Sequence, residues 1–319
     1  MSITIAYFTC RKEPKIEWFF RSLNRELLHA GTNWKDVKIL IIDYWYQYDP
    51  SQRYEQFKKH WEIYPDISVE HISPKPSPWQ GLHKVTKSNY FAASNARNTA
   101  FLNCHSQYIV CIDDLTVIKP GWYEVVRWGA QHNHVVLGSY AKVKNLSCKE
   151  DGTFSFDEFP PGLDSRFNNG VIKNDFAQLV AGSWLFGCSF GLPLDLALQV
   201  DGFDEACDGQ GAEDYDFGIR LGRITSNIYY SRQMFTYEDE DLHFTSDNVK
   251  FIRHSRMLTE KTHMPKYKGM SSDHAMLQNV LTNNSHLPFV ANNLRNYTKD
   301  PDTFKLERDW CNDMCLADM

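Results

Sequence analysis

Apolar and polar positions follow a regular order along the first half of the chain, and this order predicts strands separated by helices. Continuous apolar and β-branched runs predict buried strands over residues 3–8, 37–43, 67–72, 108–112 and 135–140. Apolar residues at helical spacing predict helices between them, over about 16–27, 54–64, 92–101 and 120–132. This alternation is typical of an α/β fold with a mainly parallel sheet that helices cover on both faces.

The second half of the chain is less regular. Residues 144–176 are polar, contain Gly, Pro and Asn, and show no clear period, which predicts a lid or an insertion rather than a simple connection. The pattern becomes regular again further on, and two strands are predicted over 227–231 and 234–237. Residues 261–319 show only short helical patterns, so we expect a small helical C-terminal extension there.

The composition is that of a folded protein, with 42% hydrophobic and 23% charged residues in a chain of 319. The net charge of −6 disfavours a large basic surface for nucleic acid. The apolar runs are too short to cross a bilayer and the first residues do not resemble a secretory signal, so we expect a cytoplasmic location. The 8 cysteines include no C-x-x-C pair, which favours buried thiols over a zinc site.

Polar side chains follow three of the predicted strands. Thr9 and Arg11 follow the first strand, Asp43 ends the second, and Asp113 and Asp114 end the strand over 108–112. Ligands of open α/β sheets bind outside the carboxyl ends of the strands, so these side chains are candidates for a ligand site. The two adjacent aspartates repel each other, and a cation would relieve that repulsion. For Asp43, an ordinary turn residue is an equally good interpretation.

The most specific segment of the sequence runs from residue 181 to 223. It contains Gly202-Phe203-Asp204-Glu205, then Glu213-Asp214, and then Asp216 with Arg220-Leu221. In order and spacing this segment resembles the second half of the GT-A-fold glycosyltransferases, which use nucleotide-sugar donors. It is most similar to inverting families, with a Glu-Asp motif like that of galactosyl- and N-acetylgalactosaminyl-transferases, although some retaining N-acetylgalactosaminyl-transferases share the Glu-Asp pattern.

Two other segments extend the resemblance over about residues 1–245. Ser94-Asn95-Ala96-Arg97-Asn98 is similar to the A-R-N helix of the inverting families, and Ile112-Asp113-Asp114-Leu115 is similar to their metal-binding D-x-D element. The resemblance implies a GT-A domain over 1–260 that is followed by the extension over 261–319. Within it, residues 1–120 would be the nucleotide-binding half and residues 121–260 the acceptor and catalytic half.

The resemblance also implies roles for individual residues of a hexosyltransferase. Asp214 would be the general base that takes the proton of the acceptor hydroxyl, and Glu213 would contact that hydroxyl. A carboxylate at the start of a helix suits the role of base, and Asp214 lies where a helix is predicted to begin. The donor, a UDP-sugar, would be bound by a set of side chains near the strand ends: Thr9, Arg11, Asp43, Arg97 and Asp113.

A divalent cation is part of the implied mechanism, because Mn²⁺ or Mg²⁺ neutralises the diphosphate as it leaves. We expect Asp114 to be the last residue of the D-x-D element, although a register that begins at Asp113 is open. A histidine would complete the metal site, and His243 is favoured over His254. Trp184 is a candidate platform for the acceptor sugar, although a core aromatic residue is an equally good interpretation.

Other functions on the same architecture are a nucleotidyltransferase and a non-catalytic sugar-binding protein. A nucleotidyltransferase needs a Gly-rich loop after the first strand, and residues 9–13 contain no glycine. Acceptors within the glycosyltransferase class are a glycan, a protein or another hydroxyl compound. A hydroxymethylated DNA base of a phage-type genome is a further acceptor, which the charge of −6 disfavours.

Overall fold

A computed structural model gives the fold. It describes residues 2–77, 80–82, 84, 89–90, 92–157, 163–208, 213–243 and 249–250. The predictions for residues 251–319, which include the helical extension and His254, lie outside the described residues. Within the described part, no helix is long and apolar enough to span a bilayer.

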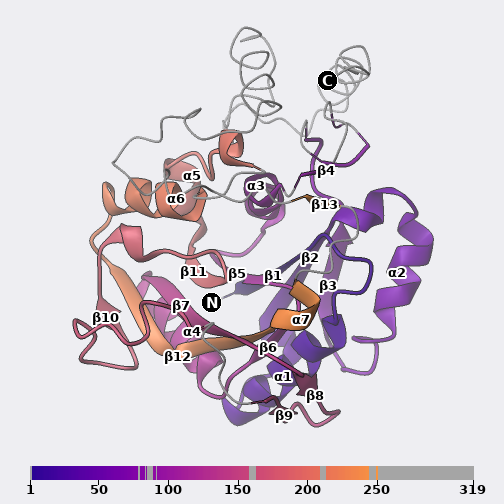
Figure 1. Cartoon of the computed structure of the whole chain (residues 1–319), viewed down its shortest axis with the longest axis horizontal. Helices are drawn as coiled ribbons and strands as arrows, with labels where there is room; N and C mark the ends of the chain where they lie inside the picture. Colours follow the sequence, from indigo (N-terminus) through magenta and orange to yellow (C-terminus); the bar gives the residue numbers. More distant parts are fainter. Residues whose placement is uncertain are drawn as a thin grey trace, which may run out of the picture.

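A central curled sheet runs through the molecule, and the described residues give it nine strands (Figure 1). Its strands are β1 (Ile3–Thr9), β2 (Val37–Asp43), β3 (Ser68–Ile72), β5 (Tyr108–Asp113), β6 (Thr116–Ile118), β7 (Val135–Val143), β10 (Gln178–Leu179), β11 (Ser189–Pro193) and β12 (Ile228–Asp239). The spatial order is β10-β12-β7-β11-β5-β1-β2-β3, and β6 pairs with β12. Strands β5, β1, β2 and β3 are parallel, whereas β11 is antiparallel to both of its neighbours.

Helices cover both faces of this sheet, as the sequence predicts (Figure 1). One face packs against α1 (Ile16–His29) and α4 (Trp122–His132). The other packs against α3 (Ala93–Asn103), α5 (Leu194–Gln199) and α6 (Glu213–Gly222). The remaining elements are short: α2 (Pro50–Lys58), α7 (Glu240–His243), the 3₁₀ turns η1 (Trp34–Asp36), η2 (Tyr44–Gln47), η3 (Gly182–Trp184) and η4 (Glu205–Cys207), and the strands β4 (Asn89–Tyr90), β8 (Ser147–Cys148), β9 (Phe154–Ser155) and β13 (Val249–Lys250).

Two predicted boundaries are wrong, and each has a local cause. The helix predicted over 54–64 is α2, which begins at Pro50 because the Asp49 side chain accepts a hydrogen bond from the Gln52 amide. The two strands predicted over 227–231 and 234–237 are one strand, β12, with an irregularity in its pairing to β7.

The polar segment over 144–176 has little regular structure in its described part. It contains the β8–β9 hairpin and an isolated bridge between Ala141 and Leu163. Asp164 and Arg166 fix it to the sheet, because the Arg166 guanidinium binds the Asp164 carboxylate and donates to the Gly138 carbonyl oxygen at 2.8 Å. Its role as a lid or an insertion stays a prediction.

Candidate functional site

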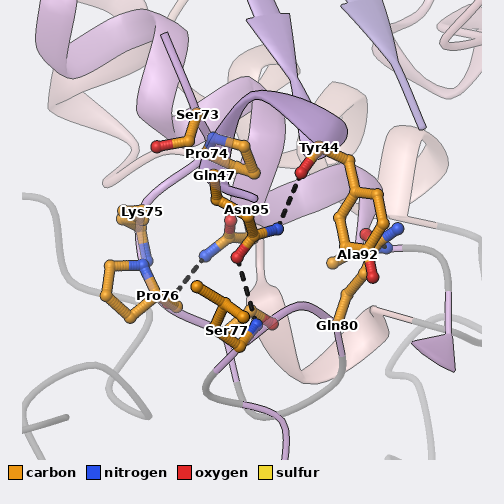
Figure 2. Close-up of a pocket in the computed structure, with 11 residues that line it drawn as sticks. Tyr44, Gln47, Ser73, Pro74, Lys75, Pro76, Ser77, Gln80, Ala92 and Asn95 are labelled. Atoms are coloured by element: carbon orange, nitrogen blue, oxygen red, sulfur yellow. Dashed lines mark hydrogen bonds between the residues drawn. The ribbon is translucent and has the colours of Figure 1, made fainter. Parts of the chain in front are cut away.

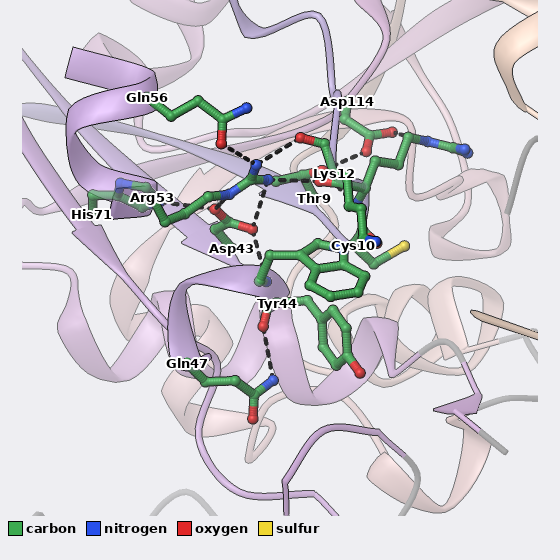
Figure 3. Close-up of polar contacts among 12 residues, drawn as sticks. Thr9, Cys10, Lys12, Asp43, Tyr44, Gln47, Arg53, Gln56, His71 and Asp114 are labelled. Atoms are coloured by element: carbon green, nitrogen blue, oxygen red, sulfur yellow. Dashed lines mark hydrogen bonds and ion pairs between the residues drawn. The ribbon is translucent and has the colours of Figure 1, made fainter. Parts of the chain in front are cut away.

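The carboxyl ends of β1 and β5 lie side by side and bring the first site residues together. Thr9 Oγ1 donates to Asp114 Oδ2 at 2.7 Å, and Arg11 Nε donates to Asp114 Oδ1 at 3.2 Å (Figure 3). Arg11 Nη1 also donates to the Leu242 carbonyl oxygen at 3.0 Å. The predicted donor residues Thr9 and Arg11 therefore hold Asp114, and Arg11 ties the backbone of α7, which ends at His243, to this strand end.

Asp43 lies at the end of β2, as predicted, but it is completely buried. Its Oδ2 accepts hydrogen bonds from Arg53 Nε at 2.6 Å and from His71 Nε2 at 3.0 Å (Figure 3). Arg53 donates onward to the carbonyl oxygens of Arg11 and Lys12, each at 2.6 Å. In this geometry Asp43 fixes the loop after β1, and its carboxylate has no free surface for the nucleoside contact that the sequence predicts.

Arg97 joins the two halves of the site. Its side chain is buried, and Nη1 donates to Glu213 Oε1 at 2.9 Å. Nη2 lies 3.4 Å from Asp113 Oδ1 and donates to the Gly187 carbonyl oxygen at 3.2 Å. The approach to Gly187 is so close that a Cβ atom there would collide with the guanidinium. The A-R-N helix, the D-x-D element and the Glu-Asp motif thus meet at one arginine.

Asp214 lies in the first turn of α6, as the sequence predicts. Its Oδ2 accepts a hydrogen bond from the Gly187 amide at 3.1 Å, and its Oδ1 accepts one from the Tyr215 amide at 2.7 Å. Burial raises the pKa of Asp214 to about 6, and the nearby Glu213 carboxylate adds to the shift while Arg97 opposes it. A carboxylate with this pKa is ionised at neutral pH and is matched to general-base catalysis there.

Asp113 is the more open of the two adjacent aspartates, since 34% of its side chain is exposed, compared with 13% for Asp114. Desolvation by the surrounding protein raises the pKa of Asp113 to about 7. The Arg97 guanidinium lowers this pKa, whereas the carboxylates of Asp114 and Glu213 raise it. Asp113 therefore has an accessible carboxylate surface, whereas both oxygens of Asp114 already accept hydrogen bonds.

The site carries more negative than positive charge. It gathers the carboxylates of residues 113–114 and 213–214 around two guanidinium groups, those of Arg11 and Arg97. Among the residues that the structure describes, no group of three or more His, Cys, Asp and Glu side chains could hold a metal ion by itself. The hard oxygen donors and the excess of negative charge nevertheless fit a divalent cation.

Glu238 begins the acidic run 238–241, which in sequence is typical of a solvated surface, or of a segment that raises metal affinity beside a cation site. The structure buries Glu238 on β12, opposite Thr116 of β6. Burial raises its pKa to about 8, and the neighbouring Asp113 carboxylate adds to the shift. The strand pairing, which the sequence does not show, is what brings this fifth carboxylate to the site.

Asp208 is a residue near the site that the sequence does not predict, and it fixes the position of α3. Its two carboxylate oxygens accept from the backbone amides of Ser94 and Asn95 at 2.7 Å and 3.2 Å, which satisfies the free N–H groups at the start of the helix. Burial raises the pKa of Asp208 well above its usual range. Because Arg97 lies one turn into α3, this contact helps to set its position.

Glu205, part of the Gly-Phe-Asp-Glu sequence, makes a second link to α3. Its Oε1 accepts from Asn98 Nδ2 at 2.8 Å, and its Oε2 accepts from Lys75 Nζ at 2.6 Å. The motif therefore has a structural role, since Glu205 joins η4 to the helix that carries Arg97.

Trp184 lies in η3 and is partly buried against the core. Its ring meets Tyr230 edge-on, with the centroids 5.4 Å apart, and its carbonyl oxygen accepts a hydrogen bond from Arg166 Nη1. These contacts give the residue a structural role, and its predicted contact with an acceptor sugar stays a prediction.

Solved structures show what kind of fold carries this site. The chain is similar to Staphylococcus aureus TarS 1–349, with a TM-score of 0.50, 14% sequence identity and 75% of this chain covered. The structure of TarS 1–349 in complex with UDP matches with the same values. The chain spans 60% of the length of these TarS chains. No protein-family model and no curated protein matches the chain. The fold is a GT-A-like glycosyltransferase fold, as the sequence predicts.

Proposed function

We propose that this protein is a glycosyltransferase that moves a sugar from a nucleotide donor, a UDP-sugar, to a hydroxyl acceptor with inversion at the anomeric carbon. The observation that carries this proposal is the arrangement of Asp214, Glu213 and Asp113 around Arg97 at the carboxyl edge of the sheet. The complex of the similar TarS structure with UDP supports the choice of nucleotide.

Asp214 acts as the general base in this proposal. The acceptor oxygen attacks the anomeric carbon, its proton passes to Asp214, and the bond from that carbon to the diphosphate oxygen breaks. The Gly187 and Tyr215 amides orient the Asp214 carboxylate through the hydrogen bonds described above. Glu213 is turned toward Arg97, and its second oxygen is the proposed contact for the acceptor hydroxyl.

The leaving diphosphate carries concentrated negative charge, and the site already has an excess of carboxylates. A Mn²⁺ or Mg²⁺ ion supplies the neutralising charge when it is bound. Asp113 and Asp114 are the proposed protein ligands, together with His243, which ends α7. Asp114 is held by Thr9 and Arg11, so these two residues orient a metal ligand in this proposal.

A donor panel tests the class of reaction. Hydrolysis and transfer of UDP-, GDP-, CMP- and TDP-sugars would be measured with Mn²⁺, with Mg²⁺ and with a chelator. We expect turnover of a UDP-sugar that the chelator abolishes and Mn²⁺ restores. Binding of no nucleotide under any of these conditions would contradict the proposed function, and turnover that is unchanged by the chelator would contradict its dependence on metal.

A further inference from the structure

The stretch of chain over residues 184–187, which leads from η3 to β11, carries a backbone contact to the proposed general base. It ends at Gly187, whose amide donates to Asp214 Oδ2 at 3.1 Å and whose carbonyl oxygen accepts from Arg97 Nη2 at 3.2 Å. Asp214 therefore takes part of its orientation from backbone that lies outside α6. Whatever fixes the path of residues 184–187 also bears on the position of the base.

Arg166 contacts this stretch at two alternate residues. Its Nη1 donates to the Trp184 carbonyl oxygen, and its guanidinium carbon lies 3.9 Å from the centroid of the Phe186 ring. The residue between them, Leu185, is buried in the core. All three residues that precede Gly187 are thus held in place, two of them by one guanidinium group.

Arg166 is itself rigidly held, because it is only 6% exposed and its donors are paired. Nε donates to Asp164 Oδ1 at 2.9 Å, and Nη2 donates to Asp164 Oδ2 at 2.6 Å and to the Gly138 carbonyl oxygen at 2.8 Å. Asp164 is buried too, and its amide donates to the Tyr140 carbonyl oxygen at 3.0 Å. The fixed fork of a guanidinium suits such a set of acceptors. Arg166 therefore links β7 to the stretch over 184–187.

The beginning of the stretch is fixed by a different contact. A Cβ atom at Gly182 in η3 would collide with the Gly218 carbonyl oxygen, so η3 lies directly on α6. This approach sets where η3 lies, and the contacts of Arg166 set how the chain continues from η3 to Gly187.

We propose that Asp164 and Arg166 are positioning residues for the general base. Asp164 orients Arg166, Arg166 sets the path of residues 184–187, and the Gly187 amide holds the Asp214 carboxylate. The proposal rests on the proposed function and extends it to the polar segment over 144–176, which in this way acts on the rate of transfer.

The contacts of Arg166 lie apart from the strand ends that carry the proposed donor residues. Its hydrogen bonds and ring contacts within the described part of the chain do not reach Thr9, Arg11 or Asp113. The cavity at the carboxyl ends of β2 and β3 is lined by η2, the loop after β3 and the start of α3 (Figure 2). A shift of Gly187 should therefore affect the step that needs the base more than donor binding.

The substitution Arg166→Lys tests the fork of donors. Lysine keeps the positive charge beside Asp164 but cannot donate to the same acceptors in the same geometry. Hydrolysis of the UDP-sugar that the donor panel identifies, with water as acceptor, would be measured together with UDP binding by calorimetry and with urea unfolding. We expect kcat to fall about 10- to 100-fold. The UDP affinity should stay within about threefold of wild type.

The dependence on pH separates positioning from a purely structural role. Burial raises the pKa of Asp214 and Glu213 raises it further, whereas Arg97 and the amides of Tyr215 and Gly187 lower it. A weaker Gly187 contact should therefore move the acidic limb of kcat/KM to higher pH. The Asp214 carboxyl resonance, assigned by its absence in Asp214→Asn, should titrate at the same higher pH. A loss of stability alone would leave both in place.

Arg232 provides the matched control, because it anchors the same polar segment through similar contacts. Its Nη1 pairs with Asp175 at 2.8 Å, and its Nε donates to the Phe167 carbonyl oxygen at 2.7 Å. Among the described residues, its side-chain contacts do not reach 184–187. Arg232→Lys should keep kcat within about twofold of wild type. Equal losses of kcat in Arg232→Lys and Arg166→Lys would overturn the proposal, as would an unchanged acidic limb in Arg166→Lys.

A second variant keeps the test decisive if Arg166→Lys does not fold. Phe186→Leu removes the ring that Arg166 contacts and leaves the hydrogen bonds of Arg166 in place; Phe186 is half-buried. We expect the same shift of the acidic limb with a smaller loss of kcat, and a wild-type profile would overturn the proposal.

The proposed function can fail separately from this inference. If wild type bound no nucleotide and hydrolysed no UDP-sugar, the proposed function would fail, and the Asp214 carboxyl resonance would still test the contact. The same titration of that resonance in wild type and Arg166→Lys would overturn the positioning role.

Discussion

Arg97 Nη1 donates to Glu213 Oε1 at 2.9 Å, although the two residues lie 116 positions apart in the sequence. The contact joins α3 to α6, and the same guanidinium reaches Asp113 at the end of β5. Three segments that carry the resemblance to glycosyltransferases are therefore parts of one electrostatic unit. The Asp113 and Asp214 carboxylates depend on this buried arginine for part of their ionisation, because Arg97 lowers the pKa of each.

The dependence of activity on pH follows from the raised carboxyl pKa values. Asp214 must be ionised to accept a proton, and burial raises its pKa to about 6. The rate of transfer should therefore fall as the pH drops through about 6, with an apparent pKa that belongs to the coupled carboxylates together. A profile of kcat/KM between pH 4 and 9 checks this. An acidic limb near pH 4 would contradict it.

The free energy of unfolding should change with pH in the direction opposite to the activity, and should fall as the pH rises. The folded-state pKa values of Asp214 and Asp113 lie above the ordinary value of 3.8, at about 6 and about 7. Such groups add stability that is fully present below pH 3.8 and is lost as the pH rises through 6 to 7. In Asp214→Asn this part of the pH dependence should be smaller. Urea unfolding at pH 5 and pH 8 measures the change in the free energy of unfolding between the two pH values. The same change in wild type and in Asp214→Asn would refute the expectation.

Removal of the arginine should destabilise the fold as well as the site. Arg97→Met leaves the largely buried Glu213 carboxylate and the partly exposed Asp113 carboxylate without their cation, and breaking the buried pair with Glu213 costs about 3–5 kcal/mol. Arg97→Lys keeps the charge but loses the forked geometry, so it should recover part of the stability and little of the activity. Urea unfolding and transfer assays measure both. A variant Arg97→Met with wild-type stability would be inconsistent with this role.

Gly187 is predicted to be intolerant of a methyl group. In Gly187→Ala the new Cβ would collide with the Arg97 guanidinium, which is buried and paired and has little freedom to move. A displacement of about 1 Å in the catalytic groups can reduce the rate about 100-fold, and we expect a loss of this size. Gly170→Ala is the control, since a Cβ there meets nothing within 4 Å. Equal activities of the two variants would argue against the contact.

Asp43 is expected to act on stability rather than on nucleotide binding. Asp43→Asn removes the charge that pairs with Arg53 and His71, and a loss of about 3–5 kcal/mol in the free energy of unfolding is expected. The folded fraction should still bind UDP with an affinity close to that of wild type. A stable Asp43→Asn variant that no longer bound UDP would instead support the nucleoside contact that the sequence predicts.

The sequence predicts the architecture well, because the parallel strands and their covering helices follow directly from apolar periodicity. It also places Asp214 at the start of a helix, since the Glu-Asp motif coincides with that start. It does not distinguish Asp43 from Asp113, because a carboxylate at the end of a strand looks the same whether an arginine buries it or solvent reaches it. The partners Arg53 and Arg97 are supplied by other elements, and only the tertiary structure brings them there.

The same limit applies to residues whose burial the sequence does not show. The acidic run that begins at Glu238 fits a solvated surface as well as a segment beside a cation, and only the pairing of β12 with β6 buries Glu238 near Asp113.

The most direct test of the central claim is a comparison of sugar transfer and donor binding in wild type and Asp214→Asn. The amide keeps the size of the side chain but cannot accept a proton. We predict that the variant binds the UDP-sugar with nearly unchanged affinity while the rate of transfer falls about 100- to 10,000-fold. Transfer at the wild-type rate by Asp214→Asn would contradict the assignment of Asp214 as the general base.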